Sequence, residues 1–240
     1  MATFIITLKT ELISRFDERI DIYRKVEDIW DEELRKRGYV FTDECKHKLE
    51  DLVRGVFVGG ASEVFNLAIS RMQKARAHVQ ATHLATTTER IHAWEDLPVL
   101  ENYHAANRAA VSRGVRIERI FILKNDLLFD SSSGEIKDAR AVEIIEKLAN
   151  EGIDVMVVWE DQVPAELIED FIIFDGSVVH AERVGAAGLY EGGTVIKNPT
   201  IVQQYVNKFD RLKTHSQAFD KCASKSLLLR NQDHDKPKNT

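Results

Sequence analysis

Two carboxylates stand at the ends of one short apolar segment and are the first residues that could do chemistry. Asp170 precedes Phe171–Phe174, and Asp175 follows it within an Asp175-Gly176 turn. An apolar run of this length beside a Gly turn predicts a buried strand that enters a hairpin. Carboxylate oxygens are ligands for hard divalent cations, and they also pair with arginine. The two acids either form a site or flank a core strand, and the sequence leaves both interpretations open.

A second group combines an imidazole, hydroxyls and aromatic rings, and follows a predicted strand over residues 78–84. In α/β folds ligands bind at the carboxyl ends of strands. Tyr103 and Asn107 are four residues apart and therefore share one face of a predicted helix. The group predicts a small-molecule pocket, whereas an ordinary solvated loop with Tyr103 in the core is the alternative. Its members are His83, Thr86, Trp94, Tyr103 and Asn107.

Arg119 is a third candidate because it lies within an apolar predicted strand. The period of two places its side chain on the same face as Val115, Ile117 and Phe121. A charge on that face requires a partner, and either Asp170 or Asp175 would suit it. Arg119 could therefore bind an anionic ligand or form a structural ion pair.

Other polar residues and the glycine-rich segment give weaker evidence for a functional site. Asp154 opens a predicted strand and is expected to be exposed. The glycine-rich segment 185–193 lacks the Gly-Lys-Ser/Thr ending of a phosphate-binding loop and predicts a loose hairpin or mobile loop. His180 and His215 are isolated histidines and are expected to be structural.

The elements that must position these residues alternate between helix and strand after residue 60. Helices are predicted over 61–76, 98–113, 138–150, 164–168 and 198–215, and strands over 78–84, 115–123, 153–159, 171–174 and 178–184. Residues 85–96 and 125–137 are predicted loops. The order predicts an α/β domain with a layered mixed sheet flanked by helices, parallel where helices cross over and antiparallel at the Asp175 hairpin.

The part before residue 61 is predicted to be helical throughout. One amphipathic helix is expected over 3–37, ended by Gly38, and a second over 42–58. The apolar face of these two helices either packs on the following domain or pairs with the same helices of a second copy of the chain. The predicted organisation is a helical segment at 1–60, an α/β domain at 61–218 and a polar, disordered tail at 219–240.

Composition and charge argue against several classes of function. The net charge of −6 argues against a general attraction to nucleic acids or anionic membranes. Cys45 and Cys222 are far apart, which favours reduced thiols in a cytoplasmic protein over a disulfide or zinc site. No apolar stretch approaches the ~20 residues of a membrane span. No cofactor is expected.

Four segments together resemble the phospholipase D-like superfamily. They are YHAANRAAVSRGVRIERIFIL at 103–123, LANEGIDVMVV at 148–158, DFIIFDGSVV at 170–179 and KFDRL at 208–212. The resemblance rests on pattern and order. It implies a phospholipase D-like α/β fold and, because single-copy members pair through their site-bearing faces, a homodimer.

Catalytic members of that superfamily carry a His-x-Lys-x-x-x-x-Asp motif on this hairpin. The resemblance assigns the His as nucleophile, the Lys as phosphate ligand and the Asp as support. With Asp175 in the Asp position, Asp170 occupies the Lys position and Ile168 the His position. Isoleucine cannot attack phosphorus, and an aspartate would repel a phosphate. The motif occurs nowhere in the sequence, so the resemblance implies the scaffold without the inherited chemistry.

Three functions follow as hypotheses. The first is a non-catalytic regulatory, ligand-sensing or protein-interaction domain, with a small-molecule or anionic ligand and a protein partner through the N-terminal helices. The second is a hydrolase in which Glu169, Asp170 and Asp175 hold a divalent metal. The third is a nucleic-acid-associated regulator, which the acidic balance weakens.

Overall fold

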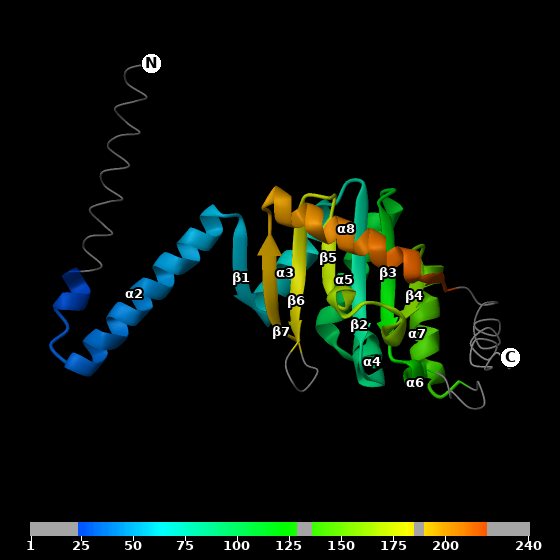
Figure 1. Ribbon diagram of the computed structural model, residues 1–240, viewed down its shortest axis with the longest axis horizontal. Coiled ribbons are helices and arrows are strands. Elements are labelled where there is room, and N and C mark those ends of the chain that lie inside the picture. The colour runs from blue at the N-terminus through cyan, green and yellow to red at the C-terminus, as the bar shows by residue number, and fades with distance from the viewer. Residues whose placement is uncertain (1–23, 129–135, 185–189, 220–240) are drawn as a thin grey trace, which may run out of the picture. The chain divides into compact units, whose positions relative to one another are not determined.

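The computed structural model describes residues 24–128, 136–184 and 190–219 (Figure 1). Contacts between Cα atoms divide the chain into two compact units, Met1–Arg54 and Gly55–Thr240. No helix among the described residues combines the length and the apolar character that crossing a membrane requires.

Among residues 24–54, the described part of the first unit, one long helix is present, α2 (Glu32–Val53). Residues 24–27 are helical as well, and the chain leaves the helix before Asp31. The Asp31 carboxylate accepts a hydrogen bond from the Leu34 backbone N–H at 2.9 Å, which starts α2 at the next residue. Gly38 lies inside this helix, where a glycine costs about 1 kcal/mol but is tolerated.

The predicted N-terminal helices were therefore wrong in their limits. Gly38 does not end a helix, and the helix predicted over 42–58 ends at Val53. The segment Val56–Gly60 is a strand, β1, in the second unit. Its β-branched and aromatic residues favour an extended backbone, and its partners lie far away in the sequence. The part of the predicted helix before residue 24 lies outside the described residues, and pairing with a second copy stays a prediction.

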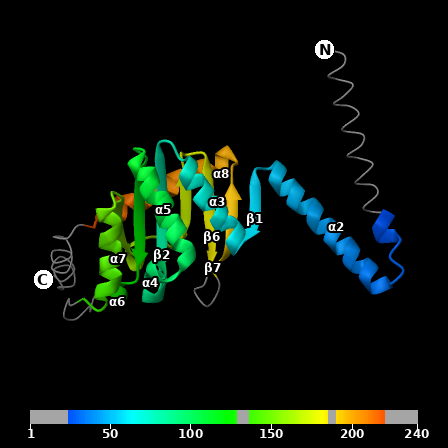
Figure 2. The same cartoon turned by 180° about the vertical axis from the view of Figure 1, so that it is seen from behind.

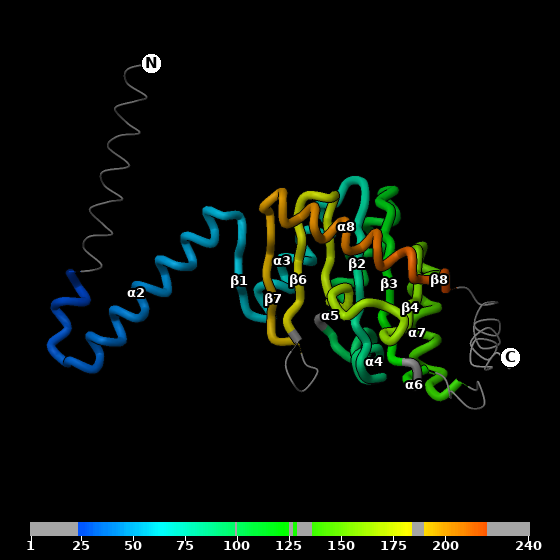
Figure 3. Tube along the Cα trace, in the orientation of Figure 1, coloured from blue at the N-terminus to red at the C-terminus, as the bar shows by residue number. Residues whose placement is uncertain are grey.

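The second unit is built on one mixed sheet with the strand order β1-β7-β6-β5-β2-β3-β4-β8. Strands β2, β3 and β4 run parallel to one another, and the remaining neighbours are antiparallel. The tube in Figure 3 follows this order from β1 to β8 across the sheet. The strands are β1 (Val56–Gly60), β2 (His78–Ala85), β3 (Arg116–Leu123), β4 (Asp154–Trp159), β5 (Phe171–Phe174), β6 (Val178–Val184), β7 (Tyr190–Ile196) and β8 (Gln217–Ala218).

Helices cover both faces of this sheet. One face packs against α3, α4, α5 and α7, and the other against α8 (Figures 1 and 2). The helices are α3 (Ala61–Lys74), α4 (Thr88–Asp96), α5 (Pro98–Ser112), α6 (Asn125–Leu128), α7 (Ala139–Asn150) and α8 (Pro199–His215), with short 3₁₀ turns at Glu160–Gln162 and Ala165–Leu167. The predicted α/β class, a layered mixed sheet flanked by helices after a helical N-terminal segment, is confirmed.

Two local predictions differ from the structure. The loop predicted over 85–96 contains α4, and the loop predicted over 125–137 begins with α6. Both helices are short, and a helix of nine residues stabilised by a few buried side chains carries little periodicity. Gly192 and Gly193 lie in β7, which pairs with β6 in an antiparallel hairpin, one of the two structures predicted for the glycine-rich segment.

Alternation along β3 separates the two cores. Ile117 and Phe121 belong to the core beneath α3, α4, α5 and α7, whereas Ile120 and Ile122 belong to the core beneath α8. Arg119 therefore faces the four helices, on the same side as Ile117 and Phe121. The period of two predicted this face correctly.

The hairpin between β5 and β6 is anchored by Asp175. Its backbone φ is +49°, a region that aspartate tolerates better than most residues. The carboxylate accepts hydrogen bonds from the backbone N–H groups of Arg76, Ala77 and His78 at 3.1, 2.9 and 3.0 Å. Burial alone would raise the pKa of Asp175, but these bonds outweigh it and lower the pKa below 3.8. Asp175 thus joins the end of β5 to the start of β2.

Replacing Asp175 by alanine should lower the free energy of unfolding by about 1–2 kcal/mol, because three backbone donors lose their acceptor and an alanine takes the left-handed conformation. Asp175→Asn keeps the conformational preference and one acceptor oxygen, so it should lose less. Urea denaturation of the two variants measures the difference. Equal stability of Asp175→Ala and the wild type would show that the anchor contributes nothing.

The glycines of β7 allow the strands on either side to approach closely. A Cβ at Gly193 would lie 2.3 Å from the carbonyl oxygen of Ala181. Gly193→Ala should therefore cost about 1–3 kcal/mol through displacement of β6 or β7. Gly60→Ala is the matched control, since a Cβ there meets nothing within 4 Å. Thermal unfolding of both variants tests the contrast, and equal melting temperatures would contradict it.

Candidate ligand-binding site

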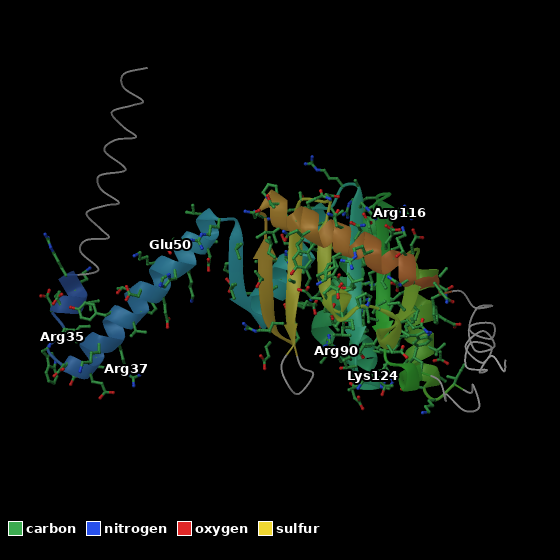
Figure 4. The ribbon with its side chains drawn as sticks, in the orientation of Figure 1. Arg35, Arg37, Glu50, Arg90, Arg116 and Lys124 are labelled. Carbon is green, nitrogen blue, oxygen red and sulfur yellow. The ribbon has the colours of Figure 1, made fainter. Side chains whose placement is uncertain are left out.

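A cavity of about 330 Å³ lies between the sheet and helices α3, α4 and α5. Aromatic and aliphatic side chains form most of its walls, and charged and imidazole side chains project from the sheet and from α4. Figure 4 locates one of these, Arg90, on α4. The residues that the site depends on are Val64, Phe65, Ala68, His83, Arg90, Ala93, Trp94, Tyr103, Arg119, Asp170, Ile172, His180, Glu182 and Tyr190.

Strand register places the polar side chains in rows. Across β3, β2, β5 and β6, Arg119 pairs with Ala81, Ala81 with Ile172, and Ile172 with His180. Residues paired across neighbouring strands point to the same face of the sheet, so these four form one row across it. Ala81 is the small member of this row, between Arg119 and Ile172.

A second row lies two residues further along. His83 pairs with Phe121, and the imidazole Nδ1 of His83 lies 3.7 Å from an Asp170 carboxylate oxygen. The Glu182 backbone N–H donates to the Asp170 carbonyl at 2.8 Å, which places Glu182 beside Asp170. Ionisable side chains from β2, from β6 and from the residue before β5 therefore meet at one edge of the cavity.

His83 is held as a neutral imidazole. Burial, followed by the charges of Arg90 and Arg119, lowers its pKa well below 6.5. The indole Nε1–H of Trp94 donates to His83 Nε2 at 3.2 Å, so the ring proton resides on Nδ1 and faces Asp170. Neither ring nitrogen is free to act as a nucleophile in this arrangement.

Arg119 is almost fully buried and binds aromatic rings. Its guanidinium carbon lies 4.3 Å from the ring centroid of Trp94 and 5.6 Å from that of Tyr103. One of its nitrogens donates to the Tyr103 hydroxyl at 3.1 Å, while its Nε has no hydrogen-bond partner among the described residues. Neither alternative from the sequence, an anion site or an ion pair, anticipated this stacked arrangement.

Asp170 is buried and paired with Arg90. The carboxylate accepts from the guanidinium at 2.9 Å and from the Leu84 backbone N–H at 3.2 Å. Burial and the neighbouring Glu182 raise the pKa of Asp170 well above 3.8, against the opposing effect of Arg90. Burial also raises the pKa of Glu182. The site therefore favours a proton on these two carboxyls more than water does.

His180 completes the polar lining. Its side chain is buried, and neither ring nitrogen has a hydrogen-bond partner among the described residues. Burial, with a contribution from Arg71, lowers its pKa to about 4, so the ring is neutral at pH 7. A buried imidazole without hydrogen-bond partners is unusual in a folded domain.

The structure brings together five of the eight residues that the sequence singled out. His83, Trp94, Tyr103, Arg119 and Asp170 all line the cavity. The other three do not line this cavity, and each has another position in the fold. Thr86 lies on the connection before α4, where Thr87 borders the cavity in its place; Asn107 is buried with its amide donating to the Tyr103 carbonyl at 2.8 Å; and Asp175 anchors the hairpin at the other end of β5.

Sequence reasoning missed Arg90, His180, Glu182 and Tyr190. Arg90 and Trp94 are four residues apart on α4, a spacing that the predicted loop concealed. His180 and Glu182 alternate with Val179 and Ala181 along β6, so the pattern for one polar face was present. That this face meets the cavity depends on strand register, which the sequence pattern does not specify.

The proposed metal site of Glu169, Asp170 and Asp175 was also wrong. Asp170 and Asp175 lie at opposite ends of β5, and the Glu169 carboxylate instead binds the Tyr205 hydroxyl and Lys208 of α8. Within the described ranges, no group of three or more His, Cys, Asp or Glu side chains is placed to hold a metal ion. The prediction of reduced cysteines can be compared with the structure at one position. Cys45 is a free thiol, and Cys222 lies outside these ranges.

The opposite pKa shifts of Asp170 and Asp175 predict opposite pH dependences. A raised pKa in the folded state means that stability is lost as the pH rises, so the wild type should lose stability relative to Asp170→Asn as the pH increases above 3.8. Asp175 has a lowered pKa, so the wild type should lose stability relative to Asp175→Asn as the pH falls below 3.8. Urea denaturation over pH 3–7 measures both differences. Parallel curves for Asp170→Asn and the wild type would contradict the buried-carboxyl interpretation.

Comparison with solved structures gives several weak similarities. Nuc, a phospholipase D family member from Salmonella typhimurium, has 17% identity and a TM-score of 0.49 over 69% of this chain and 98% of that chain. NucT from Helicobacter pylori has 13% identity and a TM-score of 0.47 over 68% and 97%. TrmBL2, an archaeal chromatin protein, has 15% identity and a TM-score of 0.45 over 88% and 69%. None reaches 0.5, so they assign no activity.

The sequence itself gives a firmer result. No curated protein matches it. A family model does match residues 72–223, which include β2 to β8 and most of the cavity lining, and it is described as a domain of unknown function, DUF6879. Since the match spans more than half of the chain, the protein belongs to the DUF6879 family.

Proposed function

We propose that this domain binds a small molecule in the cavity above the sheet and acts as a non-catalytic, ligand-sensing module. The observation that carries the proposal is a cavity of about 330 Å³ that is lined mostly by aromatic and aliphatic side chains and by the buried polar residues His83, Arg119 and Asp170. Mostly apolar walls with a few convergent polar groups are typical of small-molecule sites. Five residues selected from the sequence for their chemistry line it.

The positions of the two imidazoles of the cavity support binding over catalysis. His83 has its Nε2 occupied by the indole of Trp94 and its Nδ1 directed at Asp170. The ring nitrogens of His180 are buried and not exposed to the cavity, and no lysine lines the cavity among the described residues. The hairpin positions that carry His and Lys in catalytic phospholipase D-like proteins hold Ile168 and Asp170. A homodimer, a protein partner for the N-terminal helices and a cytoplasmic location remain proposals that rest on the sequence.

A thermal-shift screen with a metabolite library tests the binding proposal. At a concentration of 100 times its Kd, a ligand adds about 2.7 kcal/mol of stability, which corresponds to a rise in Tm of roughly 5–10 °C for a chain of this size. Ala93→Phe fills the cavity and should abolish the shift, whereas Ala109→Phe on the exposed side of α5 should keep it. A library without hits, or hits that survive Ala93→Phe, would contradict the proposal.

Catalysis is tested separately with bis(p-nitrophenyl) phosphate. We expect no turnover above the buffer rate with Mg²⁺, Mn²⁺ or Zn²⁺, because the carboxylates are dispersed or committed to Arg90 and Lys208. Release of p-nitrophenol that depends on a metal and is lost in Asp170→Asn would identify the domain as a hydrolase instead.

A further inference from the structure

Helix α2 has little of its surface covered by the described part of the chain. It is 22 residues long, and within the ranges that the structure describes Thr42 is its one buried residue. The shorter α7 buries five of its 12 residues in the core of the second unit. Because helices in proteins are stabilised mainly by packing of an apolar face, α2 requires a further surface to pack on.

The exposed apolar side chains of α2 include a stripe that runs along the helix. Leu34, Phe41 and Leu52 are 56%, 65% and 52% exposed, and the partly buried Cys45 lies in line with them. These four positions are seven, four and seven residues apart, which keeps them within about 40° of one another around the helix axis. The stripe is about 27 Å long. A continuous exposed apolar patch of this kind is typical of an interaction surface.

One flank of the stripe is covered by the segment that precedes α2. Val26 is buried, and a Cβ at Gly38 would lie only 2.8 Å from one of its methyl groups. The short helical segment at 24–27 therefore packs closely on α2 at Gly38, and the buried Thr42 lies one turn further along the same face. This contact leaves the stripe itself exposed.

The symmetry of the stripe points to a second copy of the same helix as its partner. Leu34 and Leu52 are each nine residues from Asp43. Phe41 and Cys45 are each two residues from it. Two copies that lie antiparallel and cross at Asp43 therefore bring Leu34 of each onto Leu52 of the other, and likewise Phe41 onto Cys45. A twofold interface requires one surface that is complementary to itself, and this stripe meets that requirement.

The charges of α2 favour the antiparallel direction. Residues 35–37, Arg-Lys-Arg, form a basic run near the start of the helix, and Glu50 and Asp51 form an acidic pair near its end (Figure 4). In the antiparallel arrangement, the basic run of each copy lies level with the acidic pair of the other. A parallel arrangement would place each run level with the same run of the other copy, where like charges repel, and would align the two helix dipoles.

We propose that α2 is a dimerisation helix, which pairs with α2 of a second copy of the chain in an antiparallel contact centred on Asp43. The stripe of Leu34, Phe41, Cys45 and Leu52 forms the middle of this contact, and charged side chains border it. The cavity belongs to the second unit, so the dimer does not depend on the proposed binding function.

Sedimentation equilibrium of the full chain tests the dimer. We expect the wild type to have twice the mass of one chain. Phe41→Asp should raise the dissociation constant about a hundredfold or more, because it buries two carboxylates near the twofold axis. Val40→Asp is the matched control, since Val40 is 58% exposed but points about 100° away from Phe41, and it should change the constant by less than about threefold. Circular dichroism shows whether both variants keep the folded α/β domain.

Chemical crosslinking tests the direction. Leu34→Cys and Leu52→Cys are made separately in a chain that carries Cys45→Ser and Cys222→Ser, and each is treated with a short bis-maleimide. The antiparallel arrangement predicts a crosslinked dimer when the two variants are mixed and re-equilibrated, and none from either variant alone. The reason is that the two copies of position 34 lie about 27 Å apart.

Each alternative result contradicts a defined part of the proposal. A wild-type chain that is monomeric at the highest concentration measured overturns the dimer and indicates that the stripe is covered within one chain. A dimer that Phe41→Asp leaves intact has its interface elsewhere, which overturns the role of α2. Any crosslinking result other than a dimer in the mixture alone overturns the antiparallel direction, and crosslinking of each variant with itself would identify a parallel pair.

Discussion

The burial of charge on one face of the sheet is the constraint on which this domain depends. Asp170 and Arg119 are both almost fully enclosed, and an ion removed from water costs several kcal/mol unless other groups compensate. Arg90 and the Leu84 backbone compensate Asp170, and the rings of Trp94 and Tyr103 with the Tyr103 hydroxyl compensate Arg119. Strands β3 and β5 and helices α4 and α5 must therefore be in place together for either charge to be tolerated.

One strand shows how environment sets the behaviour of a residue type. Asp170 and Asp175 stand at opposite ends of β5, yet their pKa values shift in opposite directions. At the Asp175 end, three backbone N–H groups stabilise the ionised form. At the Asp170 end, burial and a second carboxyl work against ionisation. The groups that surround each carboxyl therefore decide its pKa. Asp175 is a structural anchor of the hairpin, whereas Asp170 lines the cavity.

Most elements of the fold could be predicted from the sequence, whereas only some residues of the cavity could. The buried strands β2, β3 and β4 and helices α5, α7 and α8 have strong apolar patterns or clear caps, and the face of Arg119 followed from the period of two. Arg90 could not be found because α4 is nine residues long and its stability comes from Ile91 and Trp94 packing on the core. His180 and Glu182 required the register of β6 against β5, a contact between strands and not a property of either strand.

The same reasoning explains the error at β1. The residues of this strand resemble the end of a helix when read after α2, and only pairing with β7 makes them a strand. That pairing joins residues far apart in the sequence and depends on Gly192, whose missing side chain allows the backbones of β7 and β1 to approach. Non-local contacts of this kind are invisible to local patterns, whatever the strength of the pattern.

The position of α4 has a consequence for how relatives of this domain can diverge. This short helix supplies Arg90, Ala93 and Trp94 to the cavity, and the sheet supplies the remaining charges. Substitutions on its inner face can alter the size and polarity of the cavity while the strand order is retained. Under the proposed binding function, a few substitutions on one face of this helix would therefore change which molecule fits the cavity without changing the architecture of the domain.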